Sequence, residues 1–148
     1  MTPIKVVIAD DHALFREGLR RLLALERDLL VVGEAANNDE ILRQVERAKP
    51  DILLLDLKMP KVDTVQSLLE VGVRSPATRT LMLTAFGDDE SVLDTAKSGA
   101  RGYVLKGVAS AVLFQAIRAV HNGGVWIDKE IRSEEHTSEL QSPYVISY

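Results

Sequence analysis

The sequence ILLLDLKMP, residues 52–60, decides the fold. Aliphatic residues fill four consecutive positions and lead directly into Asp56, and Pro60 stands four positions later. An aliphatic run without polar alternation is typical of a strand covered on both faces, as strands of parallel sheets are. The stretch therefore predicts a buried strand, and it raises the question of why a carboxylate stands at the end of it.

Other aliphatic runs alternate with amphipathic helical patterns along the chain. The runs lie at 4–9, 29–35, 79–85 and 102–106. The helical patterns lie at 13–26, 37–50, 88–99 and 109–124, with one more after Asp63. Strands that alternate with helices indicate right-handed parallel crossovers. We therefore predict an α/β fold in which a five-stranded, doubly wound parallel sheet carries helices on both faces.

Local signals support the helices. Asn37 and Glu40 have the spacing of a capping box, and Asp63 and Asp88 are predicted N-caps. The pattern 13–26 has an apolar stripe that we expect to face the core. Its members are Leu14, Phe15, Gly18, Leu19, Leu22 and Leu23.

Composition excludes several classes of protein. The 148 residues are enough for one domain. The net charge of −4 argues against a protein that binds nucleic acid by electrostatic attraction alone. The chain has no cysteine, which excludes disulfides and thiolate metal sites. The first apolar run is too short for a signal peptide, and none approaches the roughly 20 residues that span a bilayer. We expect a cytoplasmic protein with no membrane contact.

Polar side chains follow four of the five predicted strands. Asp10 and Asp11 follow the first, Asp56 ends the third, Thr84 the fourth and Lys106 the fifth. Ligands of doubly wound sheets bind beyond the carboxyl ends of the strands, so these side chains should meet. Carboxylates there suit Mg²⁺, and a lysine and a hydroxyl suit phosphoryl oxygens. Each residue alone has an ordinary structural interpretation, but together they predict that Asp56 is a nucleophile that forms an acyl phosphate.

Four stretches also resemble a known family, the receiver domains of two-component response regulators. They are VVIADDHALFREGLRRLL, DILLLDLKMP, LMLTA and GARGYVLK, at 6–23, 51–60, 81–85 and 99–106. The resemblance extends over residues 4–131. It is strongest to the subfamily with a LuxR-type (NarL/FixJ-like) helix-turn-helix, and it implies a flavodoxin-like sheet with strand order 2-1-3-4-5.

The resemblance implies a role for each site residue. Asp56 would be the phosphoacceptor. The expected Mg²⁺ ligands are Asp11 directly, Asp10 through water, Asp56 and the backbone carbonyl of Lys58. Thr84 and Lys106 would contact the phosphoryl oxygens, and Tyr103 would be the switch aromatic that turns inward with Thr84. His12 could be read as a metal ligand, but we interpret it as a partly exposed helix-start residue typical of this subfamily. The family usually has Gly where Thr64 stands, and Pro or Asp where Gly107 stands.

The implied function is signalling, without turnover of a separate substrate. A sensor histidine kinase would phosphorylate Asp56, and the phosphorylated chain would form a homodimer. DNA binding would need a C-terminal helix-turn-helix that the sequence lacks. We expect a receiver domain at 1–122 and the start of a linker at 123–131.

The C-terminal segment 132–148 does not match the family. RSEEHTSELQS, residues 132–142, resembles a translated sequencing-library adapter. We interpret the segment as non-native, against the alternatives of a polar terminus or a short-tailed single-domain regulator. Its Glu and His residues are therefore not read as a metal site.

Two other functions are compatible with the fold. An aspartyl-phosphate phosphatase would need an acid two residues after the nucleophile, where Lys58 stands. A flavin carrier would need a phosphate-binding loop after the first strand, where Asp10 and Asp11 would repel phosphate.

Overall fold

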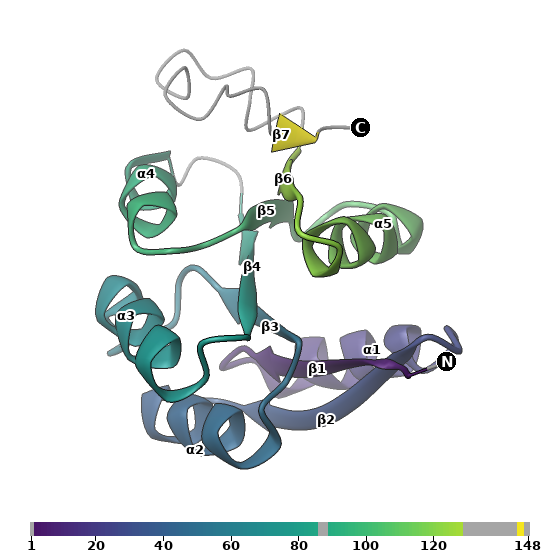
Figure 1. Cartoon of the computed structure of the whole chain (residues 1–148), viewed down its shortest axis with the longest axis horizontal. Coiled ribbons are helices and arrows are strands. Elements are labelled where there is room, and N and C mark those ends of the chain that lie inside the picture. Colours follow the sequence, from purple (N-terminus) through teal and green to yellow (C-terminus); the bar gives the residue numbers. More distant parts are fainter. Residues whose placement is uncertain (1, 86–88, 129–144, 147–148) are drawn as a thin grey trace.

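A single parallel sheet organises the chain. The computed structural model describes residues 2–85, 89–128 and 145–146. The strand order is β2-β1-β3-β4-β5-β6-β7, and all neighbours are parallel (Figure 1). The strands are β1 (Ile4–Ala9), β2 (Leu29–Ala35), β3 (Ile52–Asp56), β4 (Arg79–Thr84), β5 (Gly102–Leu105), β6 (Val125–Ile127) and β7 (Val145–Ile146). The predicted order 2-1-3-4-5 is confirmed, and two short strands extend the sheet beyond it.

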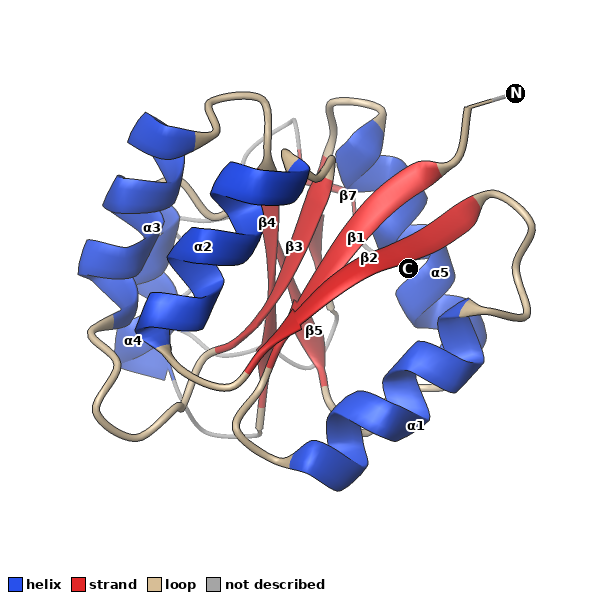
Figure 2. Ribbon diagram, turned by 90° about the horizontal axis from the view of Figure 1, so that it is seen from below, coloured by secondary structure: helices blue, strands red, loops and turns tan. Residues whose placement is uncertain are grey.

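Within the described residues, five helices cover the sheet. Figure 2 shows α1 and α5 on one face and α2, α3 and α4 on the other. The helices are α1 (Ala13–Leu23), α2 (Asn38–Ala48), α3 (Thr64–Arg74), α4 (Asp89–Lys97) and α5 (Ser110–His121). The predicted doubly wound architecture is therefore confirmed.

Two of the predicted caps are present. The Asn37 side chain accepts from Glu40 N at 3.0 Å, and the Glu40 side chain accepts from Ala36 N at 2.7 Å. Asp63 accepts from Gln66 N at 3.1 Å at the start of α3. Each cap satisfies backbone N–H groups that have no partner inside their own helix. The predicted cap Asp88 lies outside the described residues.

The sheet separates two apolar clusters. Val6 and Ile8 of β1 pack in the cluster beneath α1 and α5, while Val7 and Ala9 pack in the cluster beneath α2 and α3. Every residue of β3 is buried, as the aliphatic run predicts. β3 is a central strand whose two faces are covered. Asp56, its last residue, therefore lies at the carboxyl end of the sheet, among the neighbouring strands and loops.

Part of the α1 stripe does not pack as expected. Leu19 and Leu23 are buried, but Leu14 is 83% exposed and Leu22 is 39% exposed. Both exposed residues line a cavity of about 380 Å³ between α1 and α5. The expectation that the whole stripe faces the core is therefore wrong: Leu19 and Leu23 pack in the core, whereas Leu14 and Leu22 face the cavity and solvent.

The outer strand β2 has an irregular register and a partly satisfied edge. Its pairing with β1 shifts between Val6 and Val7. The guanidinium of Arg47 in α2 donates to the carbonyl of Val32 at 2.6 Å. One backbone acceptor of this strand is therefore satisfied from within the chain.

The segment after α5 pairs with β5. Trp126 N donates to Arg101 O and Asp128 N donates to Tyr103 O, both at 3.2 Å. These residues fall within the predicted start of a linker at 123–131, and here they extend the sheet. The predicted non-native segment 132–148 lies outside the described residues, apart from Val145 and Ile146.

Among the residues that the structure describes, no helix is long and apolar enough to cross a membrane.

Candidate functional site

The carboxyl edge of the sheet gathers the predicted site residues. Asp10 directly follows β1, Asp56 ends β3, Thr84 ends β4 and Lys106 directly follows β5. These strands are consecutive neighbours in the sheet, so their ends lie side by side. Tight pairing sets this register, because Leu57 N donates to Leu83 O at 2.8 Å and Lys106 N donates to Thr84 O at 3.0 Å.

Lys106 bridges two buried carboxylates. Its Nζ lies 2.8 Å from Asp10 Oδ2 and 3.2 Å from Asp56 Oδ2. Asp10 is fully buried and Asp56 is 4% exposed. Buried carboxylates need a partner of opposite charge, and one ammonium serves both here.

The environment of Asp56 favours proton binding. Burial raises the pKa of the Asp56 carboxyl above its usual range, and the charge of Asp10 raises it further. The backbone N–H of Lys58, 3.1 Å from Asp56 Oδ1, and the ammonium of Lys106 oppose this rise without cancelling it. Additional positive charge beside Asp56 would therefore favour its ionised, nucleophilic form.

Lys106 stays protonated. Burial alone would lower the pKa of its ammonium, but the hydrogen bond to Asp10 and the charges of Asp56 and Asp10 outweigh burial and raise it. The ammonium also lies 4.6 Å from the centroid of the Phe15 ring. Lys106 is therefore a fixed positive charge rather than a proton donor.

Four side chains form a group that could hold a divalent cation. One ligand atom each from Asp10, Asp11, His12 and Asp56 lies within 4.8 Å of all the others. Within the described part of the chain, Asp11 Oδ1 is a buried oxygen that lacks a hydrogen-bond partner. Carboxylate oxygens are the donors that Mg²⁺ prefers, and a cation would give the Asp11 oxygen a partner. The residues present therefore fit Mg²⁺.

His12 lies closer to this group than its sequence interpretation suggests. It is the N-cap residue of α1 and its side chain is 69% exposed. Its Nδ1 lies 3.1 Å from Asp10 Oδ1 and 3.4 Å from Asp11 Oδ1. Its backbone N–H donates to Asp10 Oδ1 at 2.8 Å, which helps to orient that carboxylate.

The loop after Asp56 is held by short contacts. Met59 is 4% exposed and belongs to the apolar cluster beneath α2 and α3. The Thr64 hydroxyl donates to the carbonyl of Leu57 at 3.2 Å, so this departure from the family pattern adds a bond across the loop. Lys58 donates its backbone N–H to Asp56, and the metal-ligand role of its carbonyl stays a prediction.

Thr84 and Tyr103 lie on neighbouring strands. The Thr84 hydroxyl donates to Ala85 O at 3.0 Å. Tyr103 is 1% exposed, and its hydroxyl lies 2.6 Å from Thr95 Oγ1 and donates to Val92 O at 2.9 Å. Burial raises the pKa of Tyr103 well above its usual value. The ring is therefore turned inward and held by α4.

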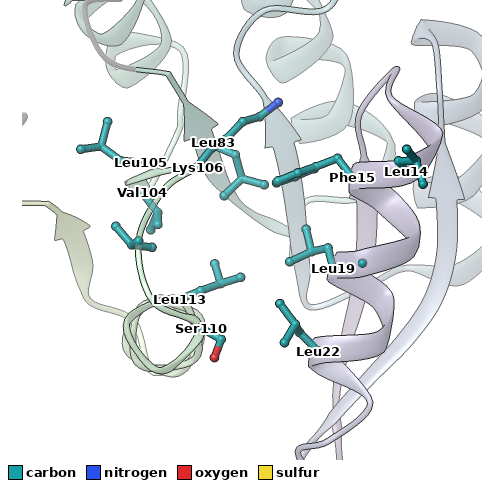
Figure 3. A pocket seen from close by; sticks show the side chains of 12 residues that line it. Leu14, Phe15, Leu19, Leu22, Leu83, Val104, Leu105, Lys106, Ser110 and Leu113 are labelled. Carbon is teal, nitrogen blue, oxygen red and sulfur yellow. The ribbon is translucent and has the colours of Figure 1, made fainter.

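Sequence reasoning missed Phe15 as a partner of Lys106. In Figure 3 the Lys106 side chain and the Phe15 ring lie next to each other, at the end of the cavity between α1 and α5. A cation beside an aromatic face is stabilised by the ring quadrupole. The helical stripe places Phe15 on the inner side of α1, but periodicity cannot show which polar group it meets.

Comparisons with known proteins agree on one kind of domain. The family model described as response regulator receiver domain matches residues 6–118. The chain is 37% identical to the transcriptional regulatory protein DegU of Brevibacillus brevis, over 86% of this chain and 54% of that protein. It is 42% identical to the uncharacterized transcriptional regulatory protein YhcZ of Bacillus subtilis (strain 168), over 81% of this chain and 56% of that protein. The chain thus spans about half the length of these two relatives.

A solved structure supports the same grouping. The two-component response regulator of the LuxR family from Aurantimonas sp. SI85-9A1 superposes with a TM-score of 0.85 at 30% sequence identity. The match covers 95% of this chain and the whole of that one.

Proposed function

The chain belongs to the family of response regulator receiver domains, and from this premise we propose that it accepts a phosphoryl group on Asp56 from a sensor histidine kinase. The observation that carries the proposal is the position of Lys106 Nζ, 3.2 Å from Asp56 Oδ2 and 2.8 Å from Asp10 Oδ2. Domains of this family are signalling domains, so the proposed chemistry is modification of the chain itself.

Transfer would make one bond and break another. An oxygen of the Asp56 carboxylate attacks phosphorus, the new O–P bond gives an acyl phosphate, and the P–N bond of the donor phosphohistidine breaks. The donor imidazole leaves with the bonding electron pair and takes up a proton. Lys106 neutralises charge that develops on the phosphoryl oxygens, and the Thr84 hydroxyl is proposed to donate to one of them.

The carboxylates on the other side of Asp56 would hold Mg²⁺. We assign the direct contact to Asp11, with Asp56 and the Lys58 carbonyl as further ligands and Asp10 acting through water. When bound, Mg²⁺ would neutralise phosphoryl charge. Asp11 suits direct contact because its Oδ1 is buried and accepts no hydrogen bond in the described residues, although His12 Nδ1 lies 3.4 Å from it.

The acyl phosphate would redistribute the contacts of Lys106. In the structure its ammonium is shared between Asp10 and Asp56. A phosphoryl group on Asp56 brings more negative charge to that side, and we propose that Thr84 and Tyr103 respond to it as the switch pair. The inward, hydrogen-bonded Tyr103 supports a defined position for this ring.

The whole protein is proposed to regulate transcription in the cytoplasm. Its curated relatives are named as transcriptional regulatory proteins and are about twice as long as the matched part. We propose that phosphorylation favours a homodimer and that DNA is bound only through a C-terminal helix-turn-helix outside this sequence.

Acetyl phosphate with Mg²⁺ provides the direct test. The expected product is the chain plus one phosphoryl group, stable to acid and labile to base, detected by intact-protein mass spectrometry. Asp56→Asn should abolish the gain, while Asp94→Asn, at an exposed position on α4, should keep it. A wild-type chain that gains no mass, or an equal gain in Asp56→Asn, would overturn the proposal.

A further inference from the structure

We propose that Asp128, in the segment after α5, is a positioning residue for Lys106. The inference rests on the proposed function, because it concerns the ammonium that would contact the phosphoryl group. It assigns to β6 and the residue after it a part in the site that neither sequence nor comparison indicates.

The Asp128 carboxylate binds the residue directly before Lys106. Asp128 is 2% exposed, and its Oδ2 accepts a hydrogen bond from the backbone N–H of Leu105 at 2.7 Å. Its own N–H donates to Tyr103 O at 3.2 Å. Strand β6 ends at Ile127, and its backbone pairing with β5 ends there too. The side chain of Asp128 therefore provides a hydrogen-bond acceptor for β5 beyond the last backbone pair.

A second contact fixes the orientation of this carboxylate. The indole N–H of Trp126 donates to Asp128 Oδ1 at 3.0 Å, and Trp126 is 1% exposed. Both carboxylate oxygens thus accept a hydrogen bond, one from the buried indole of Trp126 and one from the half-buried backbone N–H of Leu105. Hydrogen bonds to a charged acceptor are roughly twice as strong as neutral ones. The position of Asp128 relative to β5 is therefore well defined.

Lys106 needs this support because it stands at the beginning of a turn. β5 ends at Leu105, and Val108 N donates to Leu105 O at 3.2 Å, which closes a turn through Lys106 and Gly107. On the β4 side, Lys106 N donates to Thr84 O at 3.0 Å. On the β6 side, the corresponding support is the Asp128 carboxylate on Leu105 N. Together these two bonds fix the direction in which the Lys106 side chain leaves the sheet.

Coupling between Lys106 at the site and the pairing of β5 with β6 is reciprocal. If the segment after α5 fixes Lys106, then a ligand that changes the position of Lys106 must also change the stability of the pairing between β5 and β6. The phosphoryl site and the chain that continues beyond α5 would then communicate through one buried carboxylate.

The test compares Asp128→Asn with the unaltered full chain. Asparagine keeps the shape but has one acceptor oxygen for two donors, so one of the N–H groups of Leu105 and Trp126 faces an NH₂ group. We expect the rate of phosphorylation by acetyl phosphate to fall roughly three- to tenfold, the range expected from losing one buried hydrogen bond. The Mg²⁺ affinity, measured by calorimetry, should stay the same, because the hydrogen bonds described for Asp128 go to Leu105, Trp126 and Tyr103, which are not proposed metal ligands.

A direct readout of Lys106 separates this inference from the proposed function. In protein labelled with nitrogen-15 lysine, the ammonium signal of Lys106, assigned by its loss in Lys106→Arg, should shift in Asp128→Asn. Trp126→Phe, which removes the indole donor together with part of a buried ring but keeps the Asp128 carboxylate, should shift it in the same direction by less. Asp94→Asn should leave it in place.

The outcomes are distinct. If the wild-type chain is never phosphorylated, the proposed function fails, and the lysine signal still tests the positioning. An unchanged lysine signal in a folded Asp128→Asn protein overturns the inference. A purely structural role is shown, and the inference overturned, if the Mg²⁺ affinity falls by the same factor as the rate.

Discussion

Replacing Lys106 by methionine should destabilise the fold. Methionine preserves much of the aliphatic stem beside Phe15 but leaves Asp10 and Asp56 without their shared ammonium. Breaking a buried ion pair by removing one partner costs about 3–5 kcal/mol. The Lys106 side chain is 24% exposed, so water screens part of the interaction, and we expect about 2–3 kcal/mol at pH 7.

The pH dependence follows from the carboxylates. The pKa of the Asp56 carboxyl is already above its ordinary value because the group is buried, and loss of the ammonium should raise it further. A carboxyl whose folded pKa is raised favours the folded state below its unfolded pKa, and this advantage is lost as the pH rises through the folded pKa. The stability deficit of Lys106→Met should therefore be largest at neutral pH and shrink as the pH falls toward 4.

Urea unfolding followed by tryptophan fluorescence measures this deficit. The chain has a single tryptophan, Trp126, which is 1% exposed and reports loss of the β5–β6 region. Lys97→Met, at an exposed position in the last turn of α4, is the matched control and should change the free energy of unfolding by less than about 0.5 kcal/mol. Millimolar Mg²⁺ should restore more stability to Lys106→Met than it adds to the wild type. Equal stability of the two Lys→Met variants would refute the reasoning.

Three further predictions follow from contacts at the site. Asp11→Asn should weaken Mg²⁺ binding at least about tenfold, seen by calorimetry, because the amide removes the charge from a buried oxygen that accepts no hydrogen bond in the described chain; unchanged affinity would exclude direct ligation. Thr95→Val removes the 2.6 Å hydrogen bond between the Thr95 and Tyr103 hydroxyls, so it should lower the free energy of unfolding by about 1 kcal/mol in urea titrations. It should also broaden the Tyr103 ring signals in NMR spectra; a sharp ring signal at its wild-type position would contradict this. Thr64→Gly should destabilise by about 1–2 kcal/mol, because it removes the bond to Leu57 O and adds a glycine to α3, yet phosphorylation should persist; loss of phosphorylation would show that Thr64 shapes the site.

The position of the site follows from sequence because of one geometric rule. Parallel strands carry their carboxyl ends to one edge, so residues as distant in the chain as Asp10 and Lys106 meet once the strand order is known. Aliphatic runs mark these strands clearly, and the polar residue at the end of each run identifies the edge. The ion pairs between Lys106 and the two carboxylates could therefore be anticipated as a cluster, although not in their distances.

Other contacts could not be predicted from the sequence, because they depend on which elements pack against each other. Phe15 and Leu14 are neighbours on one apolar stripe, yet Phe15 meets Lys106 while Leu14 is 83% exposed. Helical periodicity gives a face but not what lies opposite it. In the sequence, Asp128 follows an apolar run of only three residues and looks like a surface residue. It is buried in the structure because β6 pairs with β5, a contact that the local sequence does not reveal. Tertiary contacts, rather than local pattern, decide such positions.

The outer edge of β2 also bears on how the chain behaves at high concentration. A free strand edge offers N–H and C=O groups to strands of other molecules, which is a route to aggregation. Here the Arg47 guanidinium occupies the Val32 carbonyl, and the register shift opposite Val6 and Val7 makes the edge irregular. Both features disfavour edge-to-edge addition of a second sheet, so this side of the molecule is protected against uncontrolled polymerisation.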